Sequence, residues 1–363
     1  MKRVWFRAAS FGFEPADLAR FFRRIRPREV RLDLGSQMNH VLTCDVLSAL
    51  SHGDHLETLI IGRNESDGLS GGHWRATELI QFYEQHTAAK LFASLRFLDV
   101  SLSCESVLWI PCCFSAVTSL RLELPGTVDE SILVPISTMM QLRVLEFRKD
   151  DDGVEPITPA RAYVVLGSLS RLTTLRLSGA FKPCYVPGSC YPCIGPVQAI
   201  ATGLIPMTLH LDPDEVEDQE LHWPGDWFTE LDAAEMFSGL TNLEELSIDA
   251  GGRWFPDHLL QIISDFCPKL KVITFIDKIS LQQFTGPKAP LFGNLREMRV
   301  EHVKSAGMSA HLVVKTLSAV APKLQVLVNL CDGYREGGFE ADVLTAFGKS
   351  RKSGRDPKAE LCS

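Results

Sequence analysis

CPKLKVITF (Cys267–Phe275) and APKLQVLVN (Ala321–Asn329) are nearly the same nine-residue phrase, and they stand 54 residues apart in one chain. A third version, GNLREMRVE (Gly293–Glu301), lies between them, its leucine 25 residues after that of the first phrase and 29 before that of the second. A phrase that returns at intervals of about 20 to 50 residues indicates an internal repeat, the pattern of a solenoid.

More copies appear when the search follows the pattern L-x-x-L-x-L toward the N-terminus. These copies begin at Leu56, Leu95, Leu120 (a shortened form), Leu142, Leu172, Leu204 (a weaker copy with Met207) and Leu243. At the front, EVRLDLG (Glu29–Gly35) has the same apolar alternation. Together they make about eleven copies at intervals of roughly 22 to 39 residues.

The alternation explains why the phrase must recur. The last apolar positions of each copy are separated by one residue, which predicts a half-buried strand. One short strand cannot bury its apolar face alone, whereas strands stacked in parallel cover each other, and each buried apolar side chain then contributes about 1.5 to 3 kcal/mol. Helical patterns follow most copies, for example in FPDHLLQIISDF (Phe255–Phe266). The sequence therefore predicts an α/β solenoid, a horseshoe with a parallel sheet on the concave side and irregular helices on the convex side.

With these features the chain resembles the leucine-rich-repeat family. The CPKL turn (Cys267–Leu270) before a new copy, the irregular repeat lengths and the degenerate copies are similar to the repeat region of fungal F-box/leucine-rich-repeat proteins. The resemblance covers residues 14–348 and implies a protein-binding horseshoe. Family members that act as ubiquitin-ligase receptors carry a helical F-box before the repeats. In this chain a helix followed by a repeat strand is already expected from Glu14, so the F-box itself is not visible.

The resemblance leaves two functions open. The first is a protein–protein recognition scaffold, similar to the substrate-binding part of a ubiquitin-ligase receptor. Such a protein would also contact a ligase adaptor if an upstream F-box is missing from this chain. The second is a free-standing interaction or inhibitor protein unrelated to ubiquitin.

The length of the chain fits one solenoid, because a repeat protein grows linearly. We expect the solenoid to span residues 1–348, with insertions near 62–90, 181–196 and 212–232. Residues 349–363 lack periodicity and are expected to form a disordered tail. No apolar run is long enough for a transmembrane helix, no signal peptide is evident, and the ten cysteines are scattered. These features indicate a cytoplasmic or nuclear protein without a membrane partner.

The charge is unevenly distributed. The net charge of the chain is −8, yet residues 1–31 hold nine Lys or Arg against three Asp or Glu. A nucleic-acid patch, an organelle-targeting helix and a solvated helix face would each explain this cluster. The solvated face is the simplest explanation, and the acidic total disfavours nucleic acid as the partner.

Two motifs suggest chemistry, and the context argues against both. GLSGG (Gly68–Gly72) matches the nucleophile-elbow pattern with Ser70, but polar residues separate it from the preceding strand, so a hydrolase is only a remote alternative. Cys184, Cys190 and Cys193 are close together, but a structural zinc site needs a fourth ligand, and none has a recognisable spacing. We therefore expect no enzyme, no cofactor and no metal, although zinc at these cysteines stays open.

Partner binding is expected on the concave face, where the residues flanking the last apolar position of each copy should point. Their charges alternate in sign, which suits a protein partner. The charged candidates are Asp99, Glu146, Arg148, Arg176, Asp249, Arg299 and Glu301.

A second candidate lies in the insertion between the copies at Leu204 and Leu243. The ten acidic residues between Asp212 and Glu235 are accompanied by no Lys or Arg. Trp223 and Trp227 flank a PGD turn in this stretch. Exposed indoles there would contact a basic partner, whereas indoles folded against the repeats would only cover the core.

Overall fold

Eleven parallel strands form one continuous sheet in the part of the chain that the structure describes. The computed structural model describes residues 3–7, 14–34, 38–52, 55–62, 74–86, 91–124, 130–149, 160–178, 229–249, 258–280, 290–304, 308–329 and 339–352. The strands are β1 (Arg3–Arg7), β2 (Glu29–Asp33), β3 (Thr58–Gly62), β4 (Phe97–Ser101), β5 (Ser119–Leu124), β6 (Val144–Lys149), β7 (Thr174–Ser178), β8 (Glu245–Asp249), β9 (Val272–Ser280), β10 (Glu297–Lys304) and β11 (Val326–Asn329). Each strand pairs in parallel with the next in chain order.

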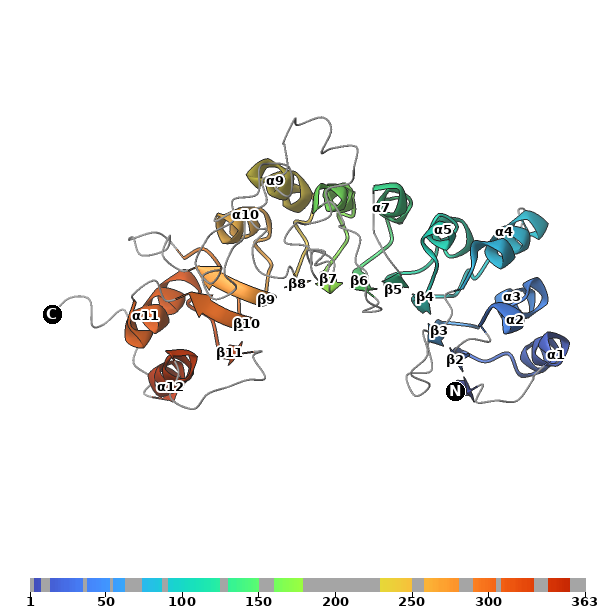
Figure 1. Ribbon diagram of the computed structural model, residues 1–363, viewed down its shortest axis with the longest axis horizontal. Coiled ribbons are helices and arrows are strands. Elements are labelled where there is room, and N and C mark those ends of the chain that lie inside the picture. The colour runs from blue at the N-terminus through green and yellow to red at the C-terminus, as the bar shows by residue number, and fades with distance from the viewer. Residues whose placement is uncertain are drawn as a thin grey trace, which may run out of the picture.

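The helices lie on the convex side of this sheet. They are α1 (Pro15–Ile25), α2 (Met38–Val41), α3 (Cys44–Ser51), α4 (Ala76–Gln85), α5 (Cys104–Val107), α6 (Ile110–Cys113), α7 (Glu130–Ser137), the 3-10 helix η3 (Ala160–Ser168), α9 (Glu230–Ser238), α10 (Leu259–Phe266), α11 (Ala310–Val320) and α12 (Phe339–Lys352). Figure 1 shows an arch with the strands along its inner side, the helices outside, and β2 and β11 toward opposite ends. The predicted fold class, a leucine-rich-repeat solenoid, is confirmed.

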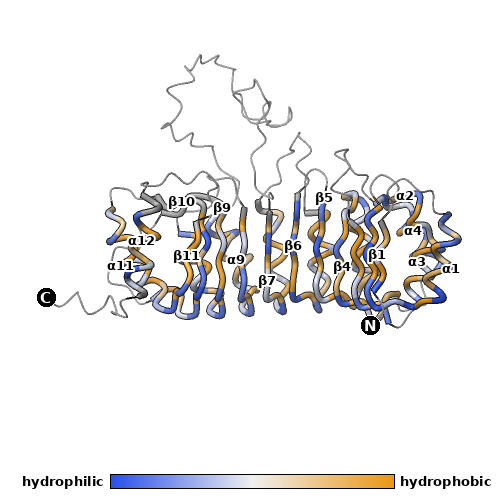
Figure 2. Tube along the Cα trace, turned by 90° about the horizontal axis from the view of Figure 1, so that it is seen from below, coloured by the Kyte–Doolittle hydropathy of each residue, from blue (hydrophilic) through white to orange (hydrophobic). Residues whose placement is uncertain are grey.

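The core lies between sheet and helices and follows from the period of two in each strand. On β4, Leu98 and Val100 are fully buried, whereas Asp99 between them faces the concave side. The register places Leu98 beside Leu59 on one neighbouring strand and Leu120 on the other. Buried side chains therefore form rows across the sheet. Figure 2 shows its strands side by side.

Local signals define where several helices begin and end. Helix α1 has Pro15 at its start and buries Leu18 and Phe22. It ends at Arg26, whose φ of 48° is left-handed and whose N–H donates to the Phe22 carbonyl oxygen at 3.0 Å. Helix α9 begins with a capping box between Thr229 and Asp232.

The repeat pattern missed one strand of the sheet. The N-terminal residues form β1, which the L-x-x-L-x-L pattern did not reveal. Strand β7 pairs directly with β8, Leu175 opposite Leu246. The weak copy predicted at Leu204 lies outside the described residues.

The expected boundaries of the solenoid also need correction. Helix α4 lies inside the predicted insertion 62–90 and buries Leu79 and Phe82, so part of this segment belongs to the convex layer. Helix α12 continues to Lys352, into the segment expected to be a disordered tail. Helix α9 takes up the last residues of the predicted insertion 212–232. The predicted insertion 181–196 lies outside the described residues.

Candidate functional site

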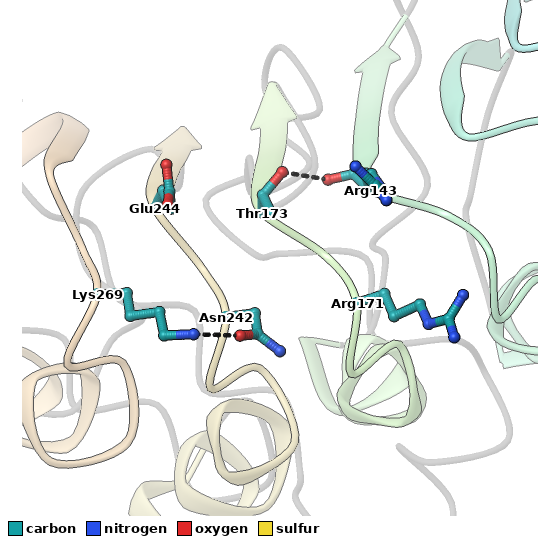
Figure 3. Close-up of a pocket in the computed structure, with 6 residues that line it drawn as sticks. All are labelled: Arg143, Arg171, Thr173, Asn242, Glu244 and Lys269. Atoms are coloured by element: carbon teal, nitrogen blue, oxygen red, sulfur yellow. Dashed lines mark hydrogen bonds between the residues drawn. The ribbon is translucent and has the colours of Figure 1, made fainter.

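One hollow lies at the edge of the sheet where strands β6 to β8 begin (Figure 3). It encloses about 260 Å³ and is lined by Arg143, Arg171, Thr173, Asn242, Glu244 and Lys269. The Thr173 hydroxyl donates to the Arg143 carbonyl oxygen at 3.0 Å, and Lys269 donates to the Asn242 side-chain oxygen at 2.6 Å. The lining thus offers exposed charge and amide groups, and it contains no histidine or cysteine to activate a nucleophile.

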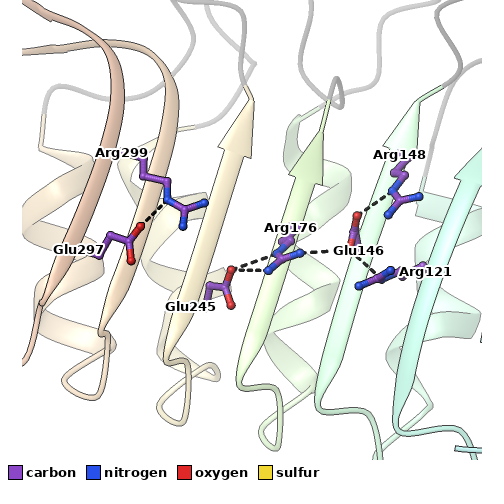
Figure 4. A network of polar contacts seen from close by, with 7 residues as sticks. All are labelled: Arg121, Glu146, Arg148, Arg176, Glu245, Glu297 and Arg299. Atoms are coloured by element: carbon purple, nitrogen blue, oxygen red, sulfur yellow. Dashed lines mark hydrogen bonds and ion pairs between the residues drawn. The ribbon is translucent and has the colours of Figure 1, made fainter. Parts of the chain in front are cut away.

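The concave face carries a second, larger group of polar side chains. Glu146 on β6 is at its centre and is only 6% exposed. Its Oε1 accepts a hydrogen bond from Arg148 Nε at 2.7 Å. Its Oε2 lies 3.0 Å from Arg121 Nε, an ion pair without hydrogen-bond alignment, and 3.6 Å from Arg176 Nη1. One buried carboxylate thus holds three guanidinium groups from three adjacent strands (Figure 4).

The contacts continue outward from Glu146 in both directions. Arg176 donates to Glu245 Oε1 from Nε at 3.1 Å and from Nη2 at 2.6 Å. On the other side Arg121 Nη1 lies 3.8 Å from Asp99 Oδ2. The result, which we call the concave network, is an alternating series across β4 to β8. Its members are Asp99, Arg121, Glu146, Arg148, Arg176 and Glu245.

The concave network is balanced in charge, with three carboxylates and three guanidinium groups. Buried charges persist only when they are paired, because desolvation penalises each isolated ion. Burial is also the main reason why the pKa of Asp99 is raised above its usual value, although the guanidinium groups of Arg148 and Arg121 act in the opposite direction. The network therefore presents fixed hydrogen-bonding groups rather than a field of one sign.

An ordered tryptophan lies at the N-terminal end of the same face. Trp5 on β1 is 67% exposed, yet its indole Nε1 donates to Asp33 Oδ2 at 2.7 Å. Arg31 lies over the indole, 5.1 Å from the ring centroid, and pairs with Asp33 Oδ1 at 3.1 Å. A large apolar ring is therefore held open to solvent by two neighbours on β2, an arrangement typical of interface hot spots.

The C-terminal end of the concave face is simpler. Arg299 pairs with Glu297 on the same strand at 2.6 Å. Val326 on β11 is exposed, and Val272 and Val328 are half-buried. This part of the face combines one ion pair with small apolar side chains.

The predicted site residues have different outcomes. Asp99, Glu146, Arg148 and Arg176 come together in the concave network. Arg299 lies on the same face in a separate ion pair with Glu297. Asp249 and Glu301 lie on described strands, but their side chains are not described. The other predicted residues lie outside the described residues, namely Trp223, Trp227, Ser70, Cys184, Cys190 and Cys193.

Sequence reasoning missed Trp5, Arg31, Asp33, Arg121 and Glu245. Glu245 occupies the first concave position of its strand, which the prediction did not use. Arg31, Asp33 and Arg121 occupy the positions that it did use, but in copies from which no candidate was taken. RVWFR (Arg3–Arg7) also has the apolar alternation of a strand, with no leucine to match the template.

One cysteine of the repeat motif belongs to the core. Cys267 is fully buried in the turn after α10, and its Sγ lies 3.7 Å from the Leu240 carbonyl oxygen. Burial raises the pKa of this thiol to about 12. Cys267 is thus a packing residue of the repeat.

Comparison with protein families finds no family that matches, and comparison with curated proteins finds no match either. Among solved structures, the leucine-rich repeat-containing protein LegL7 from Legionella pneumophila is 14% identical with a TM-score of 0.44, covering 96% of this chain and 98% of its own. A TLR13–ssRNA13 complex is 13% identical with a TM-score of 0.42, covering 94% of this chain and 38% of the TLR13 chain. The fold assignment rests on the strand register and repeat pattern of the chain itself.

None of the helices in the described ranges is long and apolar enough to cross a membrane.

Proposed function

We propose that this protein is a binding scaffold that recognises a protein partner on its concave face, with Trp5 as the principal contact. The observation that carries the proposal is that the large Trp5 side chain is exposed to solvent and yet held in position by Asp33 and Arg31. Tryptophan and arginine are enriched among residues that dominate binding energy. A side chain already held in one position also loses less entropy when it binds.

The concave network supports a protein as the partner. Because its carboxylates and guanidinium groups balance, it would not attract a polyanion or a polycation at long range. It would instead select a surface whose donors and acceptors match its own. Half-buried Ile60 and Phe97 lie between Trp5 and the network on β3 and β4, so aromatic, aliphatic and polar contacts follow one another along the sheet.

The variant Trp5→Ala tests the proposal, with Leu231→Ala as its matched control. Leu231 on α9 is 75% exposed, so its removal also deletes a large exposed apolar side chain but outside the concave face. Wild type and both variants are immobilised, and proteins retained from an extract of the source organism are quantified by mass spectrometry. Proteins retained by wild type and Leu231→Ala but lost by Trp5→Ala are the expected concave-face ligands.

A retained partner is then titrated calorimetrically, and Trp5→Ala is expected to weaken its binding by about 2 kcal/mol or more. Thermal unfolding of all three proteins controls for folding. Equal retention of every protein by wild type and by both variants would disprove the role of Trp5.

The resemblance to F-box/leucine-rich-repeat proteins suggests a finer assignment, a ubiquitin-ligase substrate receptor, with a free-standing interaction or inhibitor protein as its alternative. A gene model extended upstream of Met1 and a pull-down with the purified ligase adaptor distinguish the two. Adaptor binding by the extended chain would support the receptor. An extended chain without adaptor binding would favour the free-standing protein.

A further inference from the structure

A second charged surface lies at the edge of the sheet where the strands begin. We define this strand-start rim as the turns that lead into β2 to β11. Nine basic side chains in the described turns are all exposed, namely Arg26, Arg28, Arg96, Arg143, Arg171, Lys269, Lys271, Arg296 and Lys323. The same described turns contain two acidic side chains, Glu57 and Glu244. Nine minus two leaves +7 over the described residues of this rim, in a chain whose net charge is −8.

Backbone hydrogen bonds place the rim residues in a regular row. In each repeat, the residue after the first leucine occupies the same place in the turn. Its backbone N–H donates to the carbonyl oxygen of the equivalent residue in the preceding repeat. Examples are Arg143 to Thr118 at 2.7 Å, Thr173 to Arg143 at 2.7 Å and Arg296 to Lys271 at 2.8 Å. Strand neighbours are about 4.8 Å apart. The basic side chains are therefore spaced along one continuous edge, which is coloured hydrophilic along the lower margin of Figure 2.

Several of these cations contact neutral oxygen atoms rather than carboxylates. Lys269 donates to Asn242 Oδ1 at 2.6 Å, and Lys323 donates to Asn294 Oδ1 at 3.0 Å. Arg171 donates to Gln141 Oε1 at 2.6 Å. Such contacts orient the side chains but do not neutralise them, so the positive field of the rim persists.

Carboxylates neutralise only a small part of the rim. Within the described turns, Lys271 pairs with Glu244 at 2.7 Å and Arg28 with Glu57 at 3.7 Å. At the hollow of Figure 3, three of these cations, Arg143, Arg171 and Lys269, share the lining with one carboxylate, Glu244.

We infer that the strand-start rim binds an extended acidic segment of a partner polypeptide. A chain with several Asp or Glu would place carboxylates along the row of cations, and arginine can bind a carboxylate through two hydrogen bonds. The side-chain amides of Asn242 and Asn294 donate to the carbonyl oxygens of Ser170 and Pro268, while their oxygens accept from Lys269 and Lys323. These amides therefore hold the cations in fixed positions along the row.

The rim fits an acidic polypeptide better than a single-stranded nucleic acid. Bases bind such surfaces by stacking on exposed aromatic rings. The aromatic rings of Phe92, Phe114 and Phe292 in the described turns are buried. In addition, Glu57 and Glu244 interrupt the basic row. A polypeptide can place an uncharged residue opposite each of them, whereas every unit of a nucleic acid carries a phosphate.

The test uses three full-length proteins. The rim variant is Arg143→Glu/Arg171→Glu/Lys269→Glu. The control variant, Arg23→Glu/Arg24→Glu/Lys349→Glu, changes the net charge equally at exposed positions on α1 and α12. The probes are a fluorescent poly-glutamate peptide and a fluorescent poly-dT strand, and affinity is measured by anisotropy at low salt.

Poly-glutamate is expected to bind wild type and the control variant within about twofold of each other, and the rim variant at least about tenfold more weakly. Added salt should weaken all binding. If the rim variant is not folded by circular dichroism, the milder variant Arg143→Gln/Arg171→Gln/Lys269→Gln replaces it.

Three outcomes would overturn the inference. Equal loss in the rim and control variants would mean that only net charge matters. Tighter binding of poly-dT than of poly-glutamate, lost in the rim variant, would make the rim a nucleic-acid surface. If poly-glutamate does not bind detectably to the wild type, the rim does not bind acidic polypeptides.

Discussion

The concave network and the strand-start rim belong to the same repeats and lie a few residues apart along the chain, yet their charges are arranged differently. On the concave face Arg121, Arg148 and Arg176 converge on the buried carboxylate of Glu146. On the rim Arg171 and Lys269 bind side-chain amide oxygens and remain exposed. One surface is balanced in charge and the other is strongly basic.

The difference follows from solvation. A charge that a neighbouring strand partly covers must find an opposite charge, because water no longer stabilises it. A charge at a turn keeps its water and can stay unneutralised at little cost. Position within the repeat therefore decides which arginines contribute to stability and which remain available for a partner.

The largest expected effect tests the register on which this comparison depends. Leu246 on β8 is fully buried between Glu245 and Ser247, which face the concave side. Leu246→Ala should lower the free energy of unfolding by about 2 to 5 kcal/mol, because it leaves a cavity in the core. Chemical denaturation measures this change. A loss below about 0.5 kcal/mol would contradict the assigned faces of the strand.

The next effect concerns the centre of the concave network. Glu146→Gln keeps the shape of the side chain but leaves Arg121, Arg148 and Arg176 without their shared anion. Because these arginines are partly exposed, solvent screens their repulsion, and we expect a loss of about 1 to 2 kcal/mol.

Glu297→Gln is the matched control, since Glu297 is more exposed and pairs with one arginine, Arg299. It should cost less than about 0.5 kcal/mol. Equal losses in the two variants would remove the distinction between the central network and an ordinary surface ion pair.

A smaller effect should depend on pH. Burial raises the pKa of Asp99, so the native state binds a proton at this carboxyl group more readily than the unfolded chain does. The contribution of Asp99 to stability is thus complete below its usual pKa of 3.8 and is lost as the pH rises through the raised value.

The variant Asp99→Asn isolates this contribution. Wild type should gain stability relative to Asp99→Asn as the pH is lowered from neutrality toward 3.8. Urea unfolding of both proteins at several pH values measures the difference. A difference that moves in the opposite direction would show that the nearby guanidinium groups dominate over burial.

The smallest effect is expected on the rim. Arg143 is exposed, and its backbone carbonyl, rather than its side chain, accepts the hydrogen bond of Thr173. Arg143→Gln should change the free energy of unfolding by less than about 0.5 kcal/mol. A loss comparable with that of Glu146→Gln would mean that rim charges also stabilise the fold, and the contrast between the two surfaces would fail.

The fold was predictable from the sequence to a large extent because its signals are local. Leu142, Leu145 and Phe147 lie within six residues, and the same short pattern recurs along the chain. Prediction failed where the pattern was degenerate, because β1 has no leucine to match it. Four of the predicted concave residues do come together, since the period of two correctly gave their face.

By itself, the sequence determined the solenoid, the rows of buried apolar residues and the face to which each strand residue points, because these depend on alternation within a few residues. Only the tertiary structure decided which side chains meet. Arg176 and Glu245 are 69 residues apart, and they pair because β7 and β8 are neighbours despite the long intervening segment. Trp5 and Asp33 are 28 residues apart, and their hydrogen bond depends on the register of β1 against β2. Contacts between strands depend on which strands are adjacent and in what register, and a pattern confined to one repeat contains neither.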